Sequence, residues 1–272
     1  MKAYLDLVDN VLKYGSRKKN RTGTDTIAMF GIHYKINLAD GFPLLTTKKV
    51  FFNSIVHELF WYLSGETHIR NLRKQTKIWD AWTSEEKNWE VGRMYGYQWV
   101  NWEKYTKDPV SGNYQMTHIN QIQNVIDLIK TNPDSRRMVV TAWNPSVLDE
   151  VALPSCHSFF IFNVMDGKLN CHLTQRSGDI ALGIPFNVAC YAMLTQMIAL
   201  ETQLEVGEFS HYINDAHIYV NHIDGLEEQL KRKPFPLPVL EINPKPFWNL
   251  NFEDFHLRNY QHHPPIKFDV AV

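Results

Sequence analysis

A cysteine and an arginine that are distant in the sequence could act together in nucleophilic chemistry, because one predicted hairpin brings them close. Two runs rich in apolar and aromatic residues, 159–165 and 168–174, flank the dipeptide Asp166-Gly167. This dipeptide suits a two-residue type I′ turn, whose central residues both need φ > 0. The hairpin therefore places Cys156 near Arg176. A fixed positive charge beside a thiol favours the thiolate, which is the form that attacks electrophiles.

The predicted turn also fixes the register, in which paired positions sum to 333. Cys156 then lies opposite Ser177 and His157 opposite Arg176, with opposed Cβ atoms roughly 5 Å apart. Strict alternation puts Cys156 and Arg176 on opposite faces, so direct contact requires a bulge or an untwisted end near Gly178. The alternative is a buried core cysteine, which residue type alone favours.

Glu58 is a candidate general acid or base. It lies in a helix predicted over Thr46–Leu63, whose residues are apolar on nearly all sides. On that helix Glu58 shares a face with Phe51, Ile55 and Tyr62. A carboxyl group in such surroundings has a raised pKa, which suits proton transfer, although a structural hydrogen-bonding role is the alternative.

Other polar groups could bind an anion and a sugar. The basic segment Ser16–Thr26 and the pair Arg136-Arg137 can hold a phosphate, or they can be solvated surface. His217 and Tyr219 lie two residues apart, so on a strand they share a face and can reach one hydroxyl group. Aromatic residues gather between positions 78 and 102; some could line a pocket for a flat heterocycle, while the others belong to the core.

The remaining pattern predicts the elements that position these residues. We expect helices over Ala3–Tyr14, from a Thr117 cap to Pro133, over a short stretch opened by Ser146–Asp149, and from Pro185 to Ala199. We expect strands over 32–38 and 138–143, an exposed loop over Lys104–Gln115, an edge or loop over 234–246, and a docked C-terminus.

Composition excludes several classes of protein. The 272 residues contain no linker, which favours a single domain over 1–272, and a net charge of −1 argues against a general nucleic-acid or membrane-surface binder. Three cysteines without a framework spacing fit a reducing, cytoplasmic location. No apolar signal segment opens the chain, polar residues interrupt the run Ile184–Leu200, and no metal-binding spacing is present, so we expect no membrane span and no metal.

Many ordered motifs make the sequence similar to one family over its whole length. They are NRTGT, GFPLLTTKK, HELFWYLSG, IWDAW, YGYQW, PDSRR, AWNP, PSCH, QRSGD, LGIPFN, DAHIYVNH and DVAV. In these motifs the chain resembles the thymidylate synthases. The resemblance implies an α+β fold with a large mixed β-sheet, covered by helices on one face and packed sheet to sheet in a homodimer on the other.

The resemblance also implies reductive methylation of dUMP to dTMP with 5,10-methylenetetrahydrofolate as co-substrate, releasing dihydrofolate. Cys156 would add to C6 of the uracil ring, and further catalytic roles would fall to Glu58, Tyr95, Arg176, Asp179 and Asn187. The dUMP site would comprise Arg21, Arg176, Ser177, Asp179, Asn187, His217 and Tyr219, with Arg136 and Arg137 from the partner subunit. The folate site would comprise Ile78, Trp79, Trp82, Leu153, Asp179, Leu182, Gly183, Phe186, Tyr219, Ala271 and Val272.

Five positions depart from the family's usual pattern, and two other functions compete. The departures are Ser155, Ile161, Thr174, Cys190 and Asn214, none of which removes a catalytic group. A related hydroxymethylase would use the same thiol addition and then let water attack. Asn187 argues for uracil, because the cytosine-using relatives carry Asp there, and Trp79 with the apolar terminus argues for methylation. A silent nucleotide- or RNA-binding protein is disfavoured by Cys156, Glu58 and Arg176.

Overall fold

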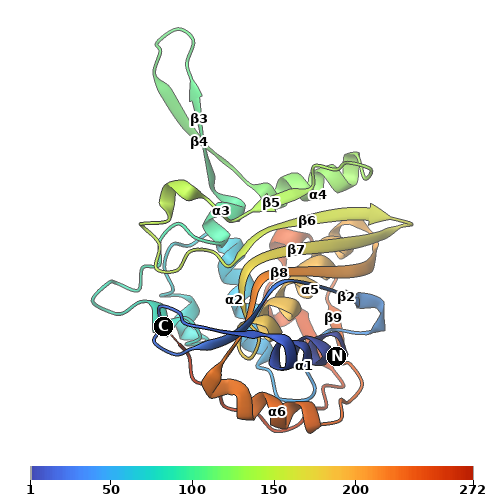
Figure 1. The fold of residues 1–272 in the computed structure, drawn as a ribbon. Helices are drawn as coiled ribbons and strands as arrows, with labels where there is room; N and C mark the ends of the chain where they lie inside the picture. Colours follow the sequence, from blue (N-terminus) through green and yellow to red (C-terminus); the bar gives the residue numbers. More distant parts are fainter. Residues whose placement is uncertain (1, 272) are drawn as a thin grey trace.

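A six-stranded sheet with helices packed on it forms the centre of the protein. This is seen in a computed structural model, which describes residues 2–271 (Figure 1). The strand order is β1-β2-β8-β7-β6-β5; β7 and β8 run parallel and the other neighbours are antiparallel. The sheet strands are β1 (Ser16–Lys18), β2 (Thr26–Asn37), β5 (Val139–Thr141), β6 (His157–Met165), β7 (Lys168–Asp179) and β8 (Glu205–Tyr219).

Helices cover one face of this sheet. The central helix α5 connects β7 to β8 and packs against both, and α2 packs on α5. The helices are α1 (Lys2–Tyr14), α2 (Phe52–Ser64), α3 (Gly96–Val100), α4 (Gln121–Thr131), α5 (Gly183–Thr202) and α6 (Ile223–Lys231). α5 is long and apolar enough to span a membrane, but 72% of its most apolar window is buried inside the protein, which identifies it as a core helix.

Side chains on the other face of the sheet stay partly exposed within the described residues. Buried and partly exposed residues alternate along β7 and β8, so that each strand turns one side to the helical core and the other outwards. The mixed α+β architecture with a large sheet is therefore the predicted one. The packing of a second subunit on the outer face stays a prediction.

Two small hairpins complete the fold. β9 (Val239–Ile242) pairs with β10 (Phe255–Arg258). β3 (Trp102–Lys107) pairs with β4 (Tyr114–Ile119) and projects away from the body (Figure 1). The expectation of a loop over Lys104–Gln115 is therefore wrong for residues 104–107 and 114–115, which pair as strands, while residues 108–113 connect the two strands. Thr117 lies in β4, and Asn120 instead caps α4 by accepting a hydrogen bond from the backbone N–H of Gln123.

Other boundaries also differ from the prediction. The strand expected over 32–38 is β2, which begins at Thr26, and the helix expected from Pro185 to Ala199 is α5, which runs over Gly183–Thr202. Residues 46–51 are not helical, because their side chains and backbone bond to distant segments: Thr46 Oγ1 contacts the backbone of Phe235, and the N–H of Val50 donates to Tyr260. The basic segment begins with strand β1 before its loop. Around Ser146 there is a single 3-10 turn, capped by Asn144.

The hairpin of β6 and β7 confirms the predicted turn and most of the predicted register. Asp166 and Gly167 have φ values of 51° and 72°, as a type I′ turn requires. The pairs from Met165↔Lys168 to Phe159↔Thr174 sum to 333, after which an irregularity shifts the register and His157 pairs with Gln175. Cys156 therefore lies opposite Arg176 and not Ser177, and the N–H of Arg176 donates to the Cys156 carbonyl (2.8 Å). The bulge that direct contact required is present.

Candidate active site

The parallel strands β7 and β8 end at the same edge of the sheet, and this edge forms one wall of a cavity of about 1020 Å³. Their register places Ser177 beside Asp215 and Asp179 beside His217. The first turns of α5 supply a second wall. Among the predicted site residues, those that line the cavity are Arg21, Glu58, Ile78, Trp79, Trp82, Tyr95, Leu153, Cys156, Arg176, Ser177, Asp179, Leu182, Gly183, Phe186, Asn187, His217, Tyr219 and Ala271.

Two of the predicted site residues that the structure describes do not line this cavity. Arg136 and Arg137 are exposed on the segment before β5, outside the cavity of their own protomer. Val272 lies outside the described residues.

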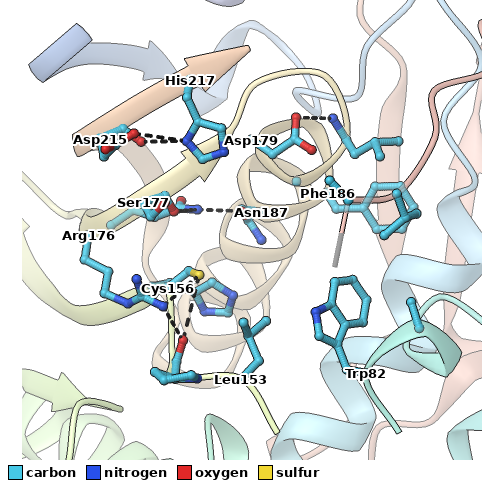
Figure 2. A pocket seen from close by; sticks show the side chains of 18 of the residues that line it. Trp82, Leu153, Cys156, Arg176, Ser177, Asp179, Phe186, Asn187, Asp215 and His217 are labelled. Atoms are coloured by element: carbon cyan, nitrogen blue, oxygen red, sulfur yellow. Dashed lines mark hydrogen bonds and ion pairs between the residues drawn. The ribbon is translucent and has the colours of Figure 1, made fainter. Parts of the chain in front are cut away.

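The thiol of Cys156 lies against the guanidinium of Arg176 (Figure 2). Arg176 Nη2 is 3.5 Å from Cys156 Sγ and also donates to the Pro154 carbonyl (2.7 Å), while Nε donates to the Ser155 carbonyl (3.0 Å). These bonds fix the guanidinium beside the sulfur. Arg176 Nη1 makes no hydrogen bond to the described residues, which leaves it available to an anionic ligand.

Tyr95 and His157 lie next to Cys156, and their rings are 4.2 Å apart. The Cys156 N–H donates to Tyr95 Oη (2.8 Å), and the Tyr95 N–H donates to Ser155 Oγ (3.2 Å), a bond that proline could not make at position 155. Tyr95 has φ 36° and ψ −104°, a conformation that non-glycine residues rarely adopt. Burial raises the pKa of Tyr95 and lowers the pKa of His157 to about 3, so both side chains are neutral near pH 7.

Glu58 is buried and faces the cavity together with Trp79. Trp79 Nε1 donates to Glu58 Oε1 (2.7 Å). Burial raises the pKa of Glu58 to about 7, although bonds from Trp79 and Tyr62 act in the opposite direction. Near neutral pH this carboxyl group can therefore both accept and release a proton. Of its expected neighbours, Ile55 and Tyr62 are buried but Phe51 is exposed, because the helix begins after it.

This raised pKa predicts a pH-dependent stability. Because the pKa of Glu58 is higher in the folded protein than its ordinary value of 4.5, folding becomes less favourable as the pH rises from 4.5 to about 7. Glu58→Gln removes this loss, so its free energy of unfolding relative to wild type should increase from pH 4.5 to pH 8. Urea denaturation at both pH values measures the change. Glu205→Gln, at the exposed start of β8, is the control and should show no such trend.

A chain of buried hydrogen bonds fixes which end of the Asn187 amide faces the cavity. Gln175 Nε2 donates both to the Ser177 carbonyl and to Asn187 Oδ1 (3.0 Å each), while Gln175 Oε1 contacts His211 Nε2 (3.0 Å). Because a carbonyl only accepts, Gln175 must present its NH₂ group to Ser177 and Asn187. The oxygen of Asn187 is thus turned towards Gln175, and its NH₂ group is left to donate to a ligand (Figure 2).

His217 is oriented in a similar way. Its Nδ1 lies 3.2 Å from both the backbone carbonyl and Oδ1 of Asp215, so Nδ1 carries the proton and Nε2 is free for a ligand hydroxyl. Asp215 also pairs with Lys18, and the bonds from His217 and Lys18 hold the pKa of Asp215 at about 2. The Tyr219 ring lies 5.3 Å from that of His217, which confirms their predicted common face.

The part of the cavity that lies around Trp79, Trp82, Leu153 and Phe186 is mainly apolar, and we call it the folate half below. The rings of Trp79 and Trp82 lie 5.1 Å apart, and Leu153 and Phe186 also line this half (Figure 2). Asp179 is its main charged group; Oδ1 accepts from the N–H groups of Ala181 (2.9 Å) and Leu182 (3.2 Å) where α5 begins. This half can hold a flat polycyclic ligand with a hydrogen-bond donor at its edge.

Two residues that hydrogen-bond to candidate residues in the site, Gln175 and Asp215, have no role in the sequence prediction, although a signal for them was present. Gln175 precedes Ser177 by two positions and Asp215 precedes His217 by two, so strand alternation places each beside a residue that was already a candidate. Trp143, whose ring centroid is 5.6 Å from the Arg176 guanidinium, lies in the motif AWNP but has no role in the sequence prediction.

The chain also matches a known family over nearly its whole length. A sequence model of the thymidylate synthase family matches residues 2–272. Within the described residues no three His, Cys, Asp or Glu side chains are grouped as metal ligands, and all three cysteines are free.

Proposed function

The chain belongs to the thymidylate synthase family, a family of folate-dependent methyltransferases, and from this premise we propose that it converts dUMP to dTMP and dihydrofolate. The observation that carries the proposal is the cavity that combines Cys156, held beside Arg176, with an Asn187 amide that donates. Uracil presents O4 as an acceptor at the matching position of its ring, whereas cytosine presents an amino group. The geometry therefore favours a uracil nucleotide.

In this proposal Cys156 adds to C6 of the uracil ring, forming an S–C6 bond and moving the electron pair of the C5–C6 double bond towards C5 and O4. The Asn187 NH₂ group donates to O4 and stabilises the enolate. When bound, 5,10-methylenetetrahydrofolate supplies the one-carbon unit and the hydride that reduces it. Glu58, whose pKa of about 7 suits both directions of proton transfer, exchanges protons with the bound nucleotide, and loss of the C5 proton lets the S–C6 bond break.

The other cavity residues bind and orient the two ligands. Arg21, Ser177 and the free Nη1 of Arg176 hold the phosphate, and His217 with Tyr219 binds the ribose hydroxyl. Asp179 accepts from the pterin edge of the folate, with Ile78, Trp79, Trp82, Leu153, Leu182, Gly183, Phe186 and Ala271 around it. These apolar groups exclude water, which would otherwise capture the methylene intermediate.

Incubation with dUMP and 5,10-methylenetetrahydrofolate tests the proposal. The nucleotide product is identified by mass and dihydrofolate is followed by absorbance. We expect dTMP and dihydrofolate in equal amounts. Hydroxymethyl-dUMP without dihydrofolate would identify a hydroxymethylase instead, and binding of dUMP without any product would identify a silent nucleotide-binding protein.

We further propose that the protein acts as a homodimer joined through the outer sheet face, with Arg136 and Arg137 reaching the partner's phosphate site. The partly exposed outer face and the exposure of both arginines outside their own cavity support this arrangement. Each active site would then combine residues from two chains.

Subunit mixing should reveal this shared site. Cys156→Ala and the double variant Arg136→Ala/Arg137→Ala are each nearly inactive as homodimers. After random exchange, half of the dimers are mixed and each carries one intact site, so activity should recover to about a quarter of wild type. As a control, Cys156→Ala mixed with Glu58→Gln should recover nothing beyond its components, because both residues line the same cavity of one chain. No recovery in the first mixture would contradict the arrangement.

A further inference from the structure

The buried imidazole of His222 lies between the cavity residue Asp179 and the C-terminal segment. His222 is 1% exposed. Its Nε2 is 2.8 Å from the backbone carbonyl of Asp269, and because a carbonyl only accepts, Nε2 carries a proton and donates. On the other side of the ring, Nδ1 lies 4.0 Å from Asp179 Oδ1 and has no hydrogen-bond partner within the described residues. One rigid ring therefore bonds to the C-terminal segment on one side and lies near the Asp179 carboxylate on the other.

The segment beyond this bond reaches the cavity. Val270 and Ala271 line it, directly after the residue that His222 holds. Phe268, just before, places its ring 5.0 Å from the imidazole, and Lys48 Nζ lies 4.5 Å from the centroid of the same phenyl ring. The imidazole thus anchors the residues that close the folate half of the cavity.

The same segment also packs closely on α6. A Cβ atom added at Gly225 would lie 2.6 Å from Phe268 Cε1 and 3.0 Å from Ile266 Cγ2. The first distance is shorter than Cβ contacts in proteins, so any larger residue at 225 would displace Phe268. The position of the segment therefore depends on two independent contacts: the hydrogen bond between His222 and Asp269, and the close packing of Phe268 against Gly225.

Asp179 is restrained from its other side by the start of α5. Its Oδ1 accepts from two backbone N–H groups there, and the same oxygen is the one nearest to His222. A displacement of the imidazole would therefore change the surroundings of the carboxylate and of residues 270–271 together.

We propose that His222 is a positioning residue that couples Asp179 to the C-terminal segment, so that the folate half of the cavity is formed and closed as one unit. The role assigned to Asp179 rests on the proposed function. His222 does not line the cavity. A substitution at position 222 should therefore affect folate use and leave dUMP binding intact.

Two amide variants separate the two sides of the ring. Gln places its amide nitrogen near the position of Nε2 and can still donate to the Asp269 carbonyl, whereas Asn places its amide near Nδ1 and cannot reach Asp269. His222→Asn should raise the KM for the folate about tenfold, which corresponds to loss of one buried hydrogen bond, and change the KM for dUMP less than twofold. His222→Gln should recover most of this loss.

Carboxypeptidase digestion measures the anchoring without reference to catalysis. Release of the terminal residues, followed by mass spectrometry, should be faster in His222→Asn and close to wild type in His222→Gln. If wild type makes no dTMP, the proposed function fails, but this measurement still decides whether His222 anchors the segment. Equal digestion of wild type and His222→Asn would overturn the anchor, and a parallel rise in both KM values would indicate general damage to the fold and overturn the coupling.

Gly225→Ala tests the same coupling without changing His222. The added methyl group should displace Phe268 and reproduce both the selective rise in folate KM and the faster digestion. Glu227→Ala, on the exposed side of α6, is the matched control and should change neither. Wild-type behaviour of Gly225→Ala in both assays would contradict the inference.

Discussion

Cys156→Ala should abolish turnover of dUMP, by on the order of 10⁴-fold or more, while the nucleotide still binds. The sulfur is the only atom at this position that can form the S–C6 bond, and without this bond C5 does not become a nucleophile. Binding should persist because Arg21, Ser177 and His217, which we assign to the phosphate and ribose, lie on other parts of the wall. Turnover is measured by product mass, and dUMP binding by calorimetry.

Two other variants make this result specific. Cys171→Ala is the matched control, because Cys171 is 1% exposed on β7 and does not line the cavity, so its activity should stay close to wild type. Arg176→Ala should lower both turnover and dUMP affinity, since the guanidinium contacts the sulfur and also offers Nη1 to the phosphate. Substantial turnover by Cys156→Ala would refute the assignment of the nucleophile.

The hairpin of β6 and β7 illustrates what the sequence could predict. The Asp166-Gly167 turn and the alternation on either side are local signals, so the turn and the register up to Phe159 were predicted correctly. The shift near His157 was not, because a bulge depends on what the strand end contacts: Arg176 bonds to the carbonyls of Pro154 and Ser155. The proximity of thiol and guanidinium was thus predictable, whereas their exact pairing was not.

The other incorrect predictions also concern structure that depends on contacts between segments. Residues 46–51 have the composition of the helix that follows them, but bonds from Phe235 and Tyr260, about 190 or more positions later, hold them out of it. The β3–β4 hairpin was not predicted because its sequence is polar and contains Asp108-Pro109 and Gly112, as loops do. Only the pairing of the two strands distinguishes it from a loop. Most site residues were found through the family resemblance, which supplied roles that no local pattern contains; the orientation of Asn187 required the structure.

Asn187→Asp should move the preference of the enzyme from dUMP towards dCMP, with a change in the ratio of kcat/KM values on the order of 10³-fold. In the wild-type protein, Asn187 turns its NH₂ group into the cavity, where it can donate to O4 of uracil. Cytosine carries an amino group at this position, so two donors would face each other. Aspartate keeps an acceptor for Gln175 and presents a second oxygen to the ligand. That oxygen accepts from the cytosine amino group and repels O4. Equal concentrations of both nucleotides, with products separated and identified by mass, give the ratio directly.

Gln175→Met tests whether discrimination comes from the orientation of Asn187 or only from its presence. Methionine fills a similar volume but cannot donate, so the Asn187 amide can turn either end to the cavity. The preference for dUMP should then fall part of the way towards equal use, although Asn187 itself is unchanged. Unaltered selectivity in Gln175→Met would mean that the chain of bonds through His211 and Gln175 has no part in base recognition. Unaltered selectivity in Asn187→Asp would remove Asn187 from the base site altogether.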